Sequence, residues 1–253
     1  MQIFYFTGTG NSLYVAKSIG REIHSIPGLL GEGTREFKDD AIGFVFPCYC
    51  FGLPRSVIEF ISQSKFSANY YFAVMTYGNI AASGLKQMEE IGAKAGIQFN
   101  YTNEILMVDN YLPGFDVQAQ LQKEKQKNIE GSLKKIVQDI QARKNSLTRK
   151  GIVSNILSKV TYIAYKYMVD SSDKKFIVQD SCNGCKICAK VCPKNNIVVE
   201  RKPRFLHTCD SCYACIHHCP QNALHLKSEK SNERFINQNI TLKEIIDTNN
   251  AVF

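Results

Sequence analysis

The sequence contains no long hydrophobic run. No stretch approaches the roughly 18 consecutive apolar residues that a membrane-spanning helix requires. The first apolar stretch, residues 3–6, is too short for a secretory leader, and no positively charged residue precedes it. The sequence therefore predicts no transmembrane span, and we expect a cytoplasmic protein.

The glycine-rich loop after the first apolar stretch lacks the residues of two common nucleotide-binding loops. The loop reads Phe6-Thr7-Gly8-Thr9-Gly10-Asn11-Ser12. It has no lysine, which a Walker loop requires, and Leu13 stands where a dinucleotide fingerprint has its third glycine. The loop is instead rich in hydroxyl donors, and it opens a helix whose N-terminus attracts anions. We expect it to bind the phosphate of a flavin mononucleotide (FMN), and a plain turn without ligand is the alternative.

Eight of the ten cysteines form two copies of the pattern C-x-x-C-x-x-C-x-x-x-C-P. The copies contain Cys182, Cys185, Cys188 and Cys192 in the first, and Cys209, Cys212, Cys215 and Cys219 in the second. This is the spacing of bacterial ferredoxins with two [4Fe–4S] clusters, in which the fourth cysteine of each motif ligates the other cluster. We therefore assign the first cluster to Cys182, Cys185, Cys188 and Cys219, and the second to Cys209, Cys212, Cys215 and Cys192.

Two other interpretations of the cysteines are weaker. Paired C-x-x-C motifs also bind zinc, but zinc needs neither the third cysteine nor the proline after the fourth. A disulfide scaffold would require an oxidising compartment, whereas thiolate ligands in this number imply a reducing one. The local histidines (His207, His217, His218 and His225) lie outside the repeat, and we expect surface groups or supports for the ligands.

The net charge of +8 is spread unevenly. Residues 1–113 hold 8 Lys and Arg against 10 Asp and Glu, residues 114–175 hold 13 against 6, and residues 176–253 hold 10 against 7. The excess lies in the middle segment, and bound anionic cofactors would lower it. We therefore predict no nucleic-acid partner.

Strand and helix patterns alternate through residues 1–113, which predicts a doubly wound parallel sheet with helices on both faces. Strands are expected at 2–6, 41–46, 70–76 and 101–108; helices at 12–24, 54–62, 83–95 and, long and charged, 116–144. The predicted units are an FMN domain at 1–145, a helical connector at 146–175, a small α+β two-cluster domain at 176–227 and a tail at 228–253. A membrane-surface or partner-binding helix is the alternative for the connector.

Two further loops follow predicted strands and are expected to contact the flavin ring, because ligands of open α/β sheets bind at the carboxyl ends of the strands. One loop contains Tyr49, Cys50, Phe51 and Gly52, and the other contains Thr76, Tyr77, Gly78 and Asn79. An aromatic residue would stack on the ring, and backbone groups would bind its polar edge. Asn110 or Tyr111 could also reach this crevice.

Cys48 and Cys50 form a C-x-C pair beside the predicted flavin. A redox dithiol is one interpretation, but alternate residues of an extended segment often splay apart, which disfavours a disulfide. Small buried residues are the interpretation that we favour.

The order of these motifs resembles the EFR1 family of flavodoxin–ferredoxin fusion proteins of anaerobes. The segments that carry the resemblance are 6–12, which matches the flavodoxin phosphate loop T/S-x-T-G-x-T/S, then 49–54, 76–79 and the eight cysteines. The resemblance implies a flavodoxin-like domain, a ferredoxin-like domain, FMN and two [4Fe–4S] clusters. It leaves the physiological reaction undefined.

The sequence favours an electron carrier that relays electrons between the clusters and FMN, with redox proteins as partners. The alternative is an FMN-dependent reductase of a small acceptor such as a quinone or nitro compound, and a redox sensor or scaffold is a third class. No His/Asp/Glu pair in the flavin loops suggests a proton-transfer site, and we assign no catalytic residue. Direction of flow and oligomeric state, including a homodimer, stay open.

Overall fold

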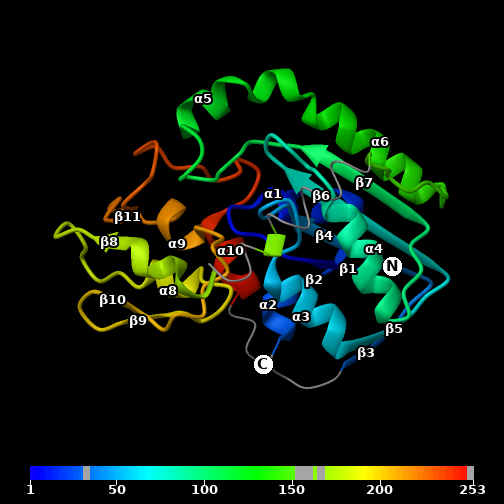
Figure 1. The fold of residues 1–253 in the computed structure, drawn as a ribbon, viewed down its shortest axis with the longest axis horizontal. Coiled ribbons are helices and arrows are strands. Elements are labelled where there is room, and N and C mark those ends of the chain that lie inside the picture. The colour runs from blue at the N-terminus through cyan, green and yellow to red at the C-terminus, as the bar shows by residue number, and fades with distance from the viewer. Residues whose placement is uncertain (31–34, 152–161, 164–168, 250–253) are drawn as a thin grey trace.

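A computed structural model describes residues 1–30, 35–151, 162–163 and 169–249. Figure 1 shows two bodies side by side: a sheet with helices, and a smaller body of short strands and helices. Across the described residues, no helix is both long enough and apolar enough to span a membrane.

Five parallel strands form the central sheet in the order β2-β1-β4-β6-β7. They are β1 (Gln2–Tyr5), β2 (Glu22–Ser25), β4 (Ala41–Pro47), β6 (Tyr70–Tyr77) and β7 (Tyr101–Leu106). Numbered along the chain, this order is 2-1-3-4-5, which is that of the flavodoxin-like fold. The fold thus fits the predicted doubly wound sheet, and the strand order reverses between β1 and β4.

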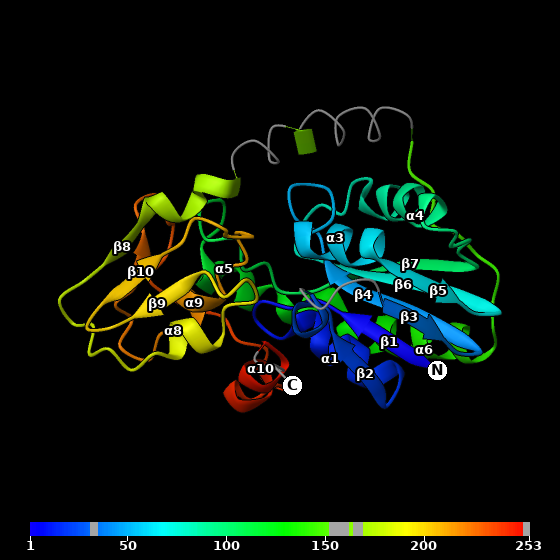
Figure 2. The same ribbon diagram turned by 90° about the horizontal axis from the view of Figure 1, so that it is seen from below.

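Helices cover both faces of the sheet, as Figure 2 shows. One face carries α1 (Asn11–Ile19) and α6 (Ile129–Gln141), and the other carries α3 (Arg55–Gln63) and α4 (Gly84–Lys94). The smaller elements of this body are α2 (Ile26–Leu29), and β3 (Arg35–Lys38) paired with β5 (Ser64–Ser67). The residues of β1, β4 and β6 are almost fully buried, because these strands are covered on both sides, whereas the edge strand β2 is more exposed.

Two predicted helices are wrong in extent. The helix expected at 12–24 ends at Ile19, and its last residues form the edge strand β2. The long helix expected at 116–144 is divided into α5 (Val117–Gln122), the 3-10 turn η1 (Glu124–Lys127) and α6. The division falls at Asn128, whose φ of 44° is left-handed and cannot continue a right-handed helix. Most of the predicted connector helix lies outside the described residues.

The smaller body is built from two similar halves. It contains η2 (Val169–Lys175), β8 (Phe176–Val178), α8 (Ile187–Lys190), β9 (Ile197–Val199), β10 (Pro203–Phe205), α9 (Ala214–His217) and β11 (Leu224–Leu226). Three pairs of residues with left-handed φ are each 27 positions apart, namely Gly184 and Ser211, Lys186 and Tyr213, Asn195 and Asn222. The cysteine repeat is therefore also a repeat of backbone conformation.

The C-terminal segment ends in α10 (Leu242–Asn249), which lies between the two bodies in both views. Its buried Ile245 packs with the core of the sheet body, and Asn249 Nδ2 donates to Val191 O of the smaller body at 2.8 Å. The tail thus contacts both the sheet body and the smaller body. The predicted division of the chain into four units stays a prediction.

Candidate cofactor site

Each set of four cysteines that the crossed assignment groups together lines one small cavity. Cys182, Cys185, Cys188 and Cys219, the Cys182 set, line the first. Cys192, Cys209, Cys212 and Cys215, the Cys209 set, line the second. Cys192 and Cys219 thus each face the cavity of the other motif, because α8 and α9 carry the fourth cysteine away from its own loop.

The four cysteines of each set line a hollow. Within the part of the chain that the structure describes, no three His, Cys, Asp or Glu side chains form a group that could hold one metal ion. Backbone N–H groups also point at the sulfurs: Asn196 N lies 3.3 Å from Cys192 Sγ, and Ala223 N lies 3.3 Å from Cys219 Sγ. Such hydrogen bonds are among the groups that set a cluster's potential.

The two sets differ in exposure. All four cysteines of the Cys209 set are buried, whereas Cys185 is exposed and the rest of the Cys182 set is half-buried. Asp210, beside Cys209, accepts hydrogen bonds from Ser56 N (3.2 Å) and Ser56 Oγ (2.5 Å) at the start of α3. The Cys209 set therefore faces the sheet body, and the Cys182 set faces solvent.

A larger cavity of about 510 Å³ opens at the carboxyl ends of the sheet strands. It lies where the strand order reverses, the usual ligand crevice of this fold class. Its lining contains nearly all the residues predicted to hold the flavin: Thr7, Gly8, Thr9, Asn11, Ser12, Tyr49, Cys50, Phe51, Thr76, Tyr77, Gly78 and Asn79. Asn110 and Tyr111 line it as well. The predicted Gly10 and Gly52 are not part of the lining.

The phosphate loop keeps hydroxyl donors available. Thr7 Oγ1 accepts from Gly10 N at 3.1 Å, and Thr9 Oγ1 accepts from Asn110 Nδ2 at 2.5 Å. A hydroxyl that accepts can still donate its own proton, so both threonines can bind an anion. Gly10 precedes α1 without a side-chain cap, with a φ of 100°. The first N–H groups of this nine-residue helix are thus left to a ligand, and the loop fits a phosphate.

The loop between β4 and α3 makes a tight turn at Cys50 and Phe51, whose φ angles are 46° and 68°. Tyr49 and Gly52 exchange backbone hydrogen bonds of 2.8 and 2.9 Å across it. A Cβ at Gly52 would lie 2.3 Å from the ring of Tyr162, so glycine is required there. The N–H and carbonyl of Gly52 are thus used by the turn, and its expected role on the flavin edge stays a prediction.

The C-x-C pair does not behave as a dithiol. The Cys48 thiol points at the carbonyl of Ala81 at 3.5 Å, and its burial raises its pKa to about 12. A thiol with such a pKa is protonated at neutral pH and is a poor nucleophile. Cys50 is exposed at the turn, so the expectation of a buried residue is wrong for it.

A half-buried lysine, Lys127, holds the loop after β6. Lys127 Nζ donates to Gly78 O at 3.1 Å and to Met107 O at 2.6 Å. Burial lowers the pKa of Lys127, although the nearby carboxylates of Asp109 and Glu124 oppose this shift. Asn79 Nδ2 donates to Asp109 Oδ2 at 2.7 Å. The loop predicted to line the ring is therefore fixed by contacts that the sequence did not reveal.

The larger cavity is also lined by the Cys209 loop. Ser211, Cys212 and Tyr213 complete its wall. The phosphate loop lies directly against this segment, because a Cβ at Gly8 would be 2.8 Å from Cys212 O and 3.4 Å from Cys212 Cβ. One chain thus brings Cys212 of the Cys209 set and the predicted flavin loops to a single cavity.

Two histidines of α9 and its end secure this junction, and sequence reasoning placed neither there. His217 Nε2 lies 2.9 Å from Asn110 O, and His218 Nε2 lies 3.3 Å from Gly8 O. Both side chains are buried, as is His225, so these three are not surface groups, and support for the ligands is the part of the expectation that stays a prediction. Burial lowers the pKa of His217 to about 4. A neutral histidine can donate from one nitrogen to a carbonyl, which suits these contacts.

The tail supplies another contact that the sequence concealed. Asn237 N donates to Thr9 O at 2.9 Å, and Asn237 Nδ2 donates to Asn11 Oδ1 at 3.0 Å. Lys17 of α1 pairs with Glu244 of α10. These residues are more than 200 positions apart, so no local pattern could have indicated them. The tail therefore clamps the phosphate loop from outside.

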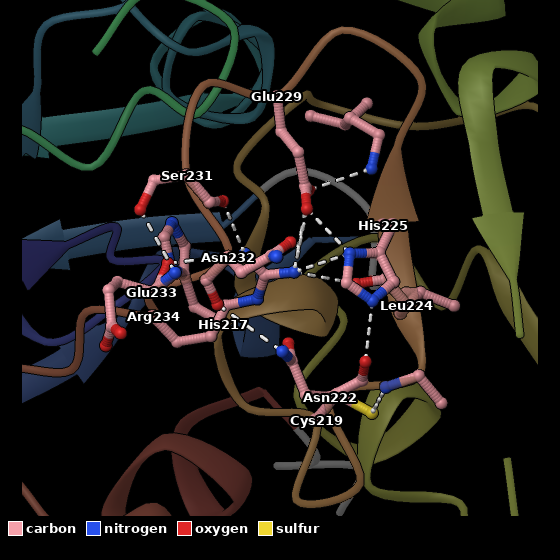
Figure 3. Close-up of polar contacts among 12 residues, drawn as sticks. His217, Cys219, Asn222, Leu224, His225, Glu229, Ser231, Asn232, Glu233 and Arg234 are labelled. Carbon is pink, nitrogen blue, oxygen red and sulfur yellow. Dashed lines mark hydrogen bonds and ion pairs between the residues drawn. The ribbon is translucent and has the colours of Figure 1, made fainter. Parts of the chain in front are cut away.

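A partly buried cluster of polar contacts among His225, Glu229 and Arg234 anchors the start of the tail, as Figure 3 shows. His225 Nδ1 lies 2.6 Å from Glu229 Oε1, and Arg234 Nη2 donates to the same oxygen at 3.2 Å. His225 Nε2 lies 2.6 Å from Asn222 O, in the turn that follows Cys219. Beyond Arg234, the backbone N–H of Phe235 donates to His217 Nδ1 at 3.1 Å. These polar contacts thus link the Cys182 set to the tail segment whose Asn237 contacts the phosphate loop.

Comparisons with known proteins support the smaller body. Residues 181–224 match the family model described as the 4Fe-4S dicluster domain. This match covers the eight cysteines and supports iron–sulfur clusters in this segment. Membership of the EFR1 family stays a prediction.

Other comparisons add little. No curated protein matches the chain. A solved structure named "Putative flavoprotein" from Bacteroides uniformis ATCC 8492 is similar at 16% identity, covering 49% of this chain and 96% of its own, with a TM-score of 0.34. A likeness at that score carries no weight in the argument below.

Proposed function

We propose that this protein is an electron carrier that relays electrons between two [4Fe–4S] clusters and FMN. The observation that carries the proposal is the shared cavity, in which Cys212 of the Cys209 set meets the phosphate loop at Gly8. Electron transfer slows steeply with distance, so a cluster and a flavin that exchange electrons must lie close together. A wall made jointly by the two sets of residues supports this requirement.

In the proposal the Cys209 set binds the cluster beside the flavin, and the Cys182 set binds the outer cluster. Thr7, Thr9, Ser12 and the N-terminus of α1 would bind the FMN phosphate. Tyr49, Phe51 and Tyr77 line the remaining cavity and offer rings for the flavin. A flavin accepts one or two electrons, and it would supply the conversion between one- and two-electron chemistry.

The lining favours a carrier over a reductase. Of the residues described around the cavity, none is a histidine or a glutamate, and Asp109 is the one carboxylate. Its two oxygens accept from Asn79 Nδ2 at 2.7 Å and from Tyr111 N at 2.9 Å. A general acid or base must be positioned against substrate, and this carboxylate instead holds the loops.

The test is anaerobic purification followed by iron, sulfide and flavin assays. About eight irons, acid-labile sulfide and one FMN per chain are expected for two four-iron clusters and one flavin. Zinc without sulfide would contradict the clusters, and a full complement of iron without flavin would contradict the relay. Rapid turnover of a quinone or nitro compound without any partner protein would favour the reductase instead.

A further inference from the structure

We infer that the surface around the Cys182 set is the docking site of an acidic one-electron carrier protein. This inference rests on the proposed function and adds the place and the chemistry of the partner. We call this surface the Cys182 face, and it consists of Cys185, Lys186, Val198, Arg201, Lys202 and Arg204.

The Cys182 face offers the accessible entrance to the cluster-binding body. Cys185 is exposed, and Lys186 beside it lines the same cavity as the Cys182 set. The Cys209 set has no comparable exposure, because all four of its cysteines are buried. The phosphate loop and α3 lie against its loop, through Gly8 and Ser56. An external protein can therefore approach the first set closely but not the second.

The hairpin of β9 and β10 brings more positive charge to this entrance. β9 ends at Val199 and β10 begins at Pro203, and both residues line the cavity of the Cys182 set. The turn between them carries the exposed Arg201 and Lys202, and Arg201 O would lie 3.0 Å from a Cβ at Gly184. The turn thus lies directly against the loop that contains Cys182 and Cys185.

Positive charge exceeds negative charge on this face. It carries Lys186, Arg201, Lys202 and Arg204, against Asp180 and the exposed Glu200 of the turn. Asp180 pairs with Lys202 at 2.7 Å, which offsets one charge at the turn. Arg204 is exposed, and across the hairpin it pairs with Val198, whose side chain is 38% exposed. A small apolar contact with a positive rim matches the composition of a transient interface.

The position of the face also suits an external partner. The β9–β10 hairpin extends from the smaller body away from the parallel sheet (Figures 1 and 2), whereas Ile187 of α8 packs against the core of the sheet body. A carrier bound there leaves the cavity at the sheet open. An acidic carrier would be attracted over a distance of about 10 Å at about 0.1 M salt and over a longer distance at lower salt, and this attraction would be screened as salt increases.

The electron balance of the docked step is simple. The reduced carrier, a one-electron iron–sulfur protein, loses one electron, and the cluster of the Cys182 set gains it. No proton and no bond is exchanged. The same face serves the reverse step when the carrier is oxidised.

The experiment measures both binding and electron transfer with the holoprotein. The probes are a strongly acidic ferredoxin and a basic cytochrome c, each titrated by biolayer interferometry at low and high salt. The charge-reversal variant is Lys186→Glu with Arg201→Glu. The matched control is Lys86→Glu with Lys134→Glu, which reverses two exposed lysines on α4 and α6 of the sheet body. Iron content, flavin content and melting temperature establish that each variant is folded.

At low salt, we expect the Cys182-face variant to bind the acidic ferredoxin about tenfold more weakly than the wild type, and to accept electrons from it about tenfold more slowly. The control variant should match the wild type, and reduction by dithionite should be the same in all three. Salt should weaken the wild-type complex and leave the variant nearly unchanged.

Three results would overturn the inference. One is equal binding of the acidic ferredoxin by the two variants, and another is tighter binding of the basic cytochrome. The third is binding of duplex DNA or anionic vesicles as tight as that of the ferredoxin. If any of these results is found and dithionite still reduces the clusters and the flavin, the docking site is wrong but the proposed relay is not contradicted. If clusters or flavin are absent from the wild type, the proposed function itself fails.

Discussion

Replacement of Gly8 by alanine tests the contact between the phosphate loop and the Cys209 loop. The added Cβ would lie 2.8 Å from Cys212 O and 3.5 Å from Tyr49 Oη. The first distance is too short for a Cβ, and the obstacle is a backbone atom rather than the end of a flexible side chain. The two loops must therefore separate by a few tenths of an ångström.

Overpacking of this kind typically costs about 1–3 kcal/mol. For a chain of this size, each kcal/mol lowers the melting temperature by about 2–4 °C, so we expect a decrease of about 2–12 °C. Because the strain lies between the flavin loops and the Cys209 loop, FMN should also bind more weakly, and flavin reduction through the clusters should slow. Direct reduction of the clusters by dithionite should be unaffected.

The matched control is Gly151→Ala, where a Cβ meets no atom within 4 Å. That change should leave FMN affinity and electron transfer intact and stabilise the protein slightly, through the unfolded chain. Differential scanning calorimetry, FMN fluorescence titration and stopped-flow absorbance measure the three quantities. A Gly8→Ala protein that matches the control in all of them would refute the contact between the two loops.

Three other changes test separate parts of the account. Cys192→Ala should remove the cluster of Cys209, Cys212 and Cys215 and leave about four irons per chain, whereas loss of the cluster of its own motif would overturn the crossed assignment. Asn237→Ala removes the hydrogen bond that the side-chain amide donates to Asn11 Oδ1. FMN binding, measured by fluorescence titration, should weaken by about 1 kcal/mol, or roughly fivefold. The exposed Asn239→Ala is the control, and equal FMN affinities of the two variants would contradict the role of Asn237. The hydrogen bond from Lys17, and then those from the backbone and side chain of Thr241, lower the pKa of Glu244 to about 2. The stability from these contacts is therefore present above about pH 4.5 and is lost as the pH falls toward 2. Glu244→Gln should therefore cost about 0.2–1 kcal/mol at pH 7 and nothing near pH 2 in chemical denaturation, and a constant difference would contradict the assignment.

The predictable parts of this molecule are those that depend on local spacing. The cysteine repeat predicts two similar halves, and residues with left-handed φ recur at the same 27-residue spacing as the cysteines. The alternation of strands and helices likewise gave the parallel sheet, because buried parallel strands read as apolar runs. Edge strand β2 was missed, since Glu22–Ser25 is short and more exposed than the central strands and lies beside a helical pattern.

The contacts that join the two bodies could not be predicted in this way. Asn237 meets Asn11 and His218 meets Gly8 across more than 200 residues, and such pairs leave no periodic signal. The histidines could have drawn attention only by their place on a short helix directly before Cys219. The break at Asn128 is another such case, because asparagine adopts left-handed φ more readily than most residues but does not always do so.

The most direct test of the central claim is the rate of flavin reduction through the clusters in stopped-flow absorbance, measured over a range of protein concentrations. The account predicts a rate that is independent of concentration, because one chain brings Cys212 of the Cys209 set and the flavin loops to one cavity. It also predicts that Cys192→Ala greatly slows this rate. A rate proportional to protein concentration, or one unchanged by Cys192→Ala, would contradict the relay within one chain.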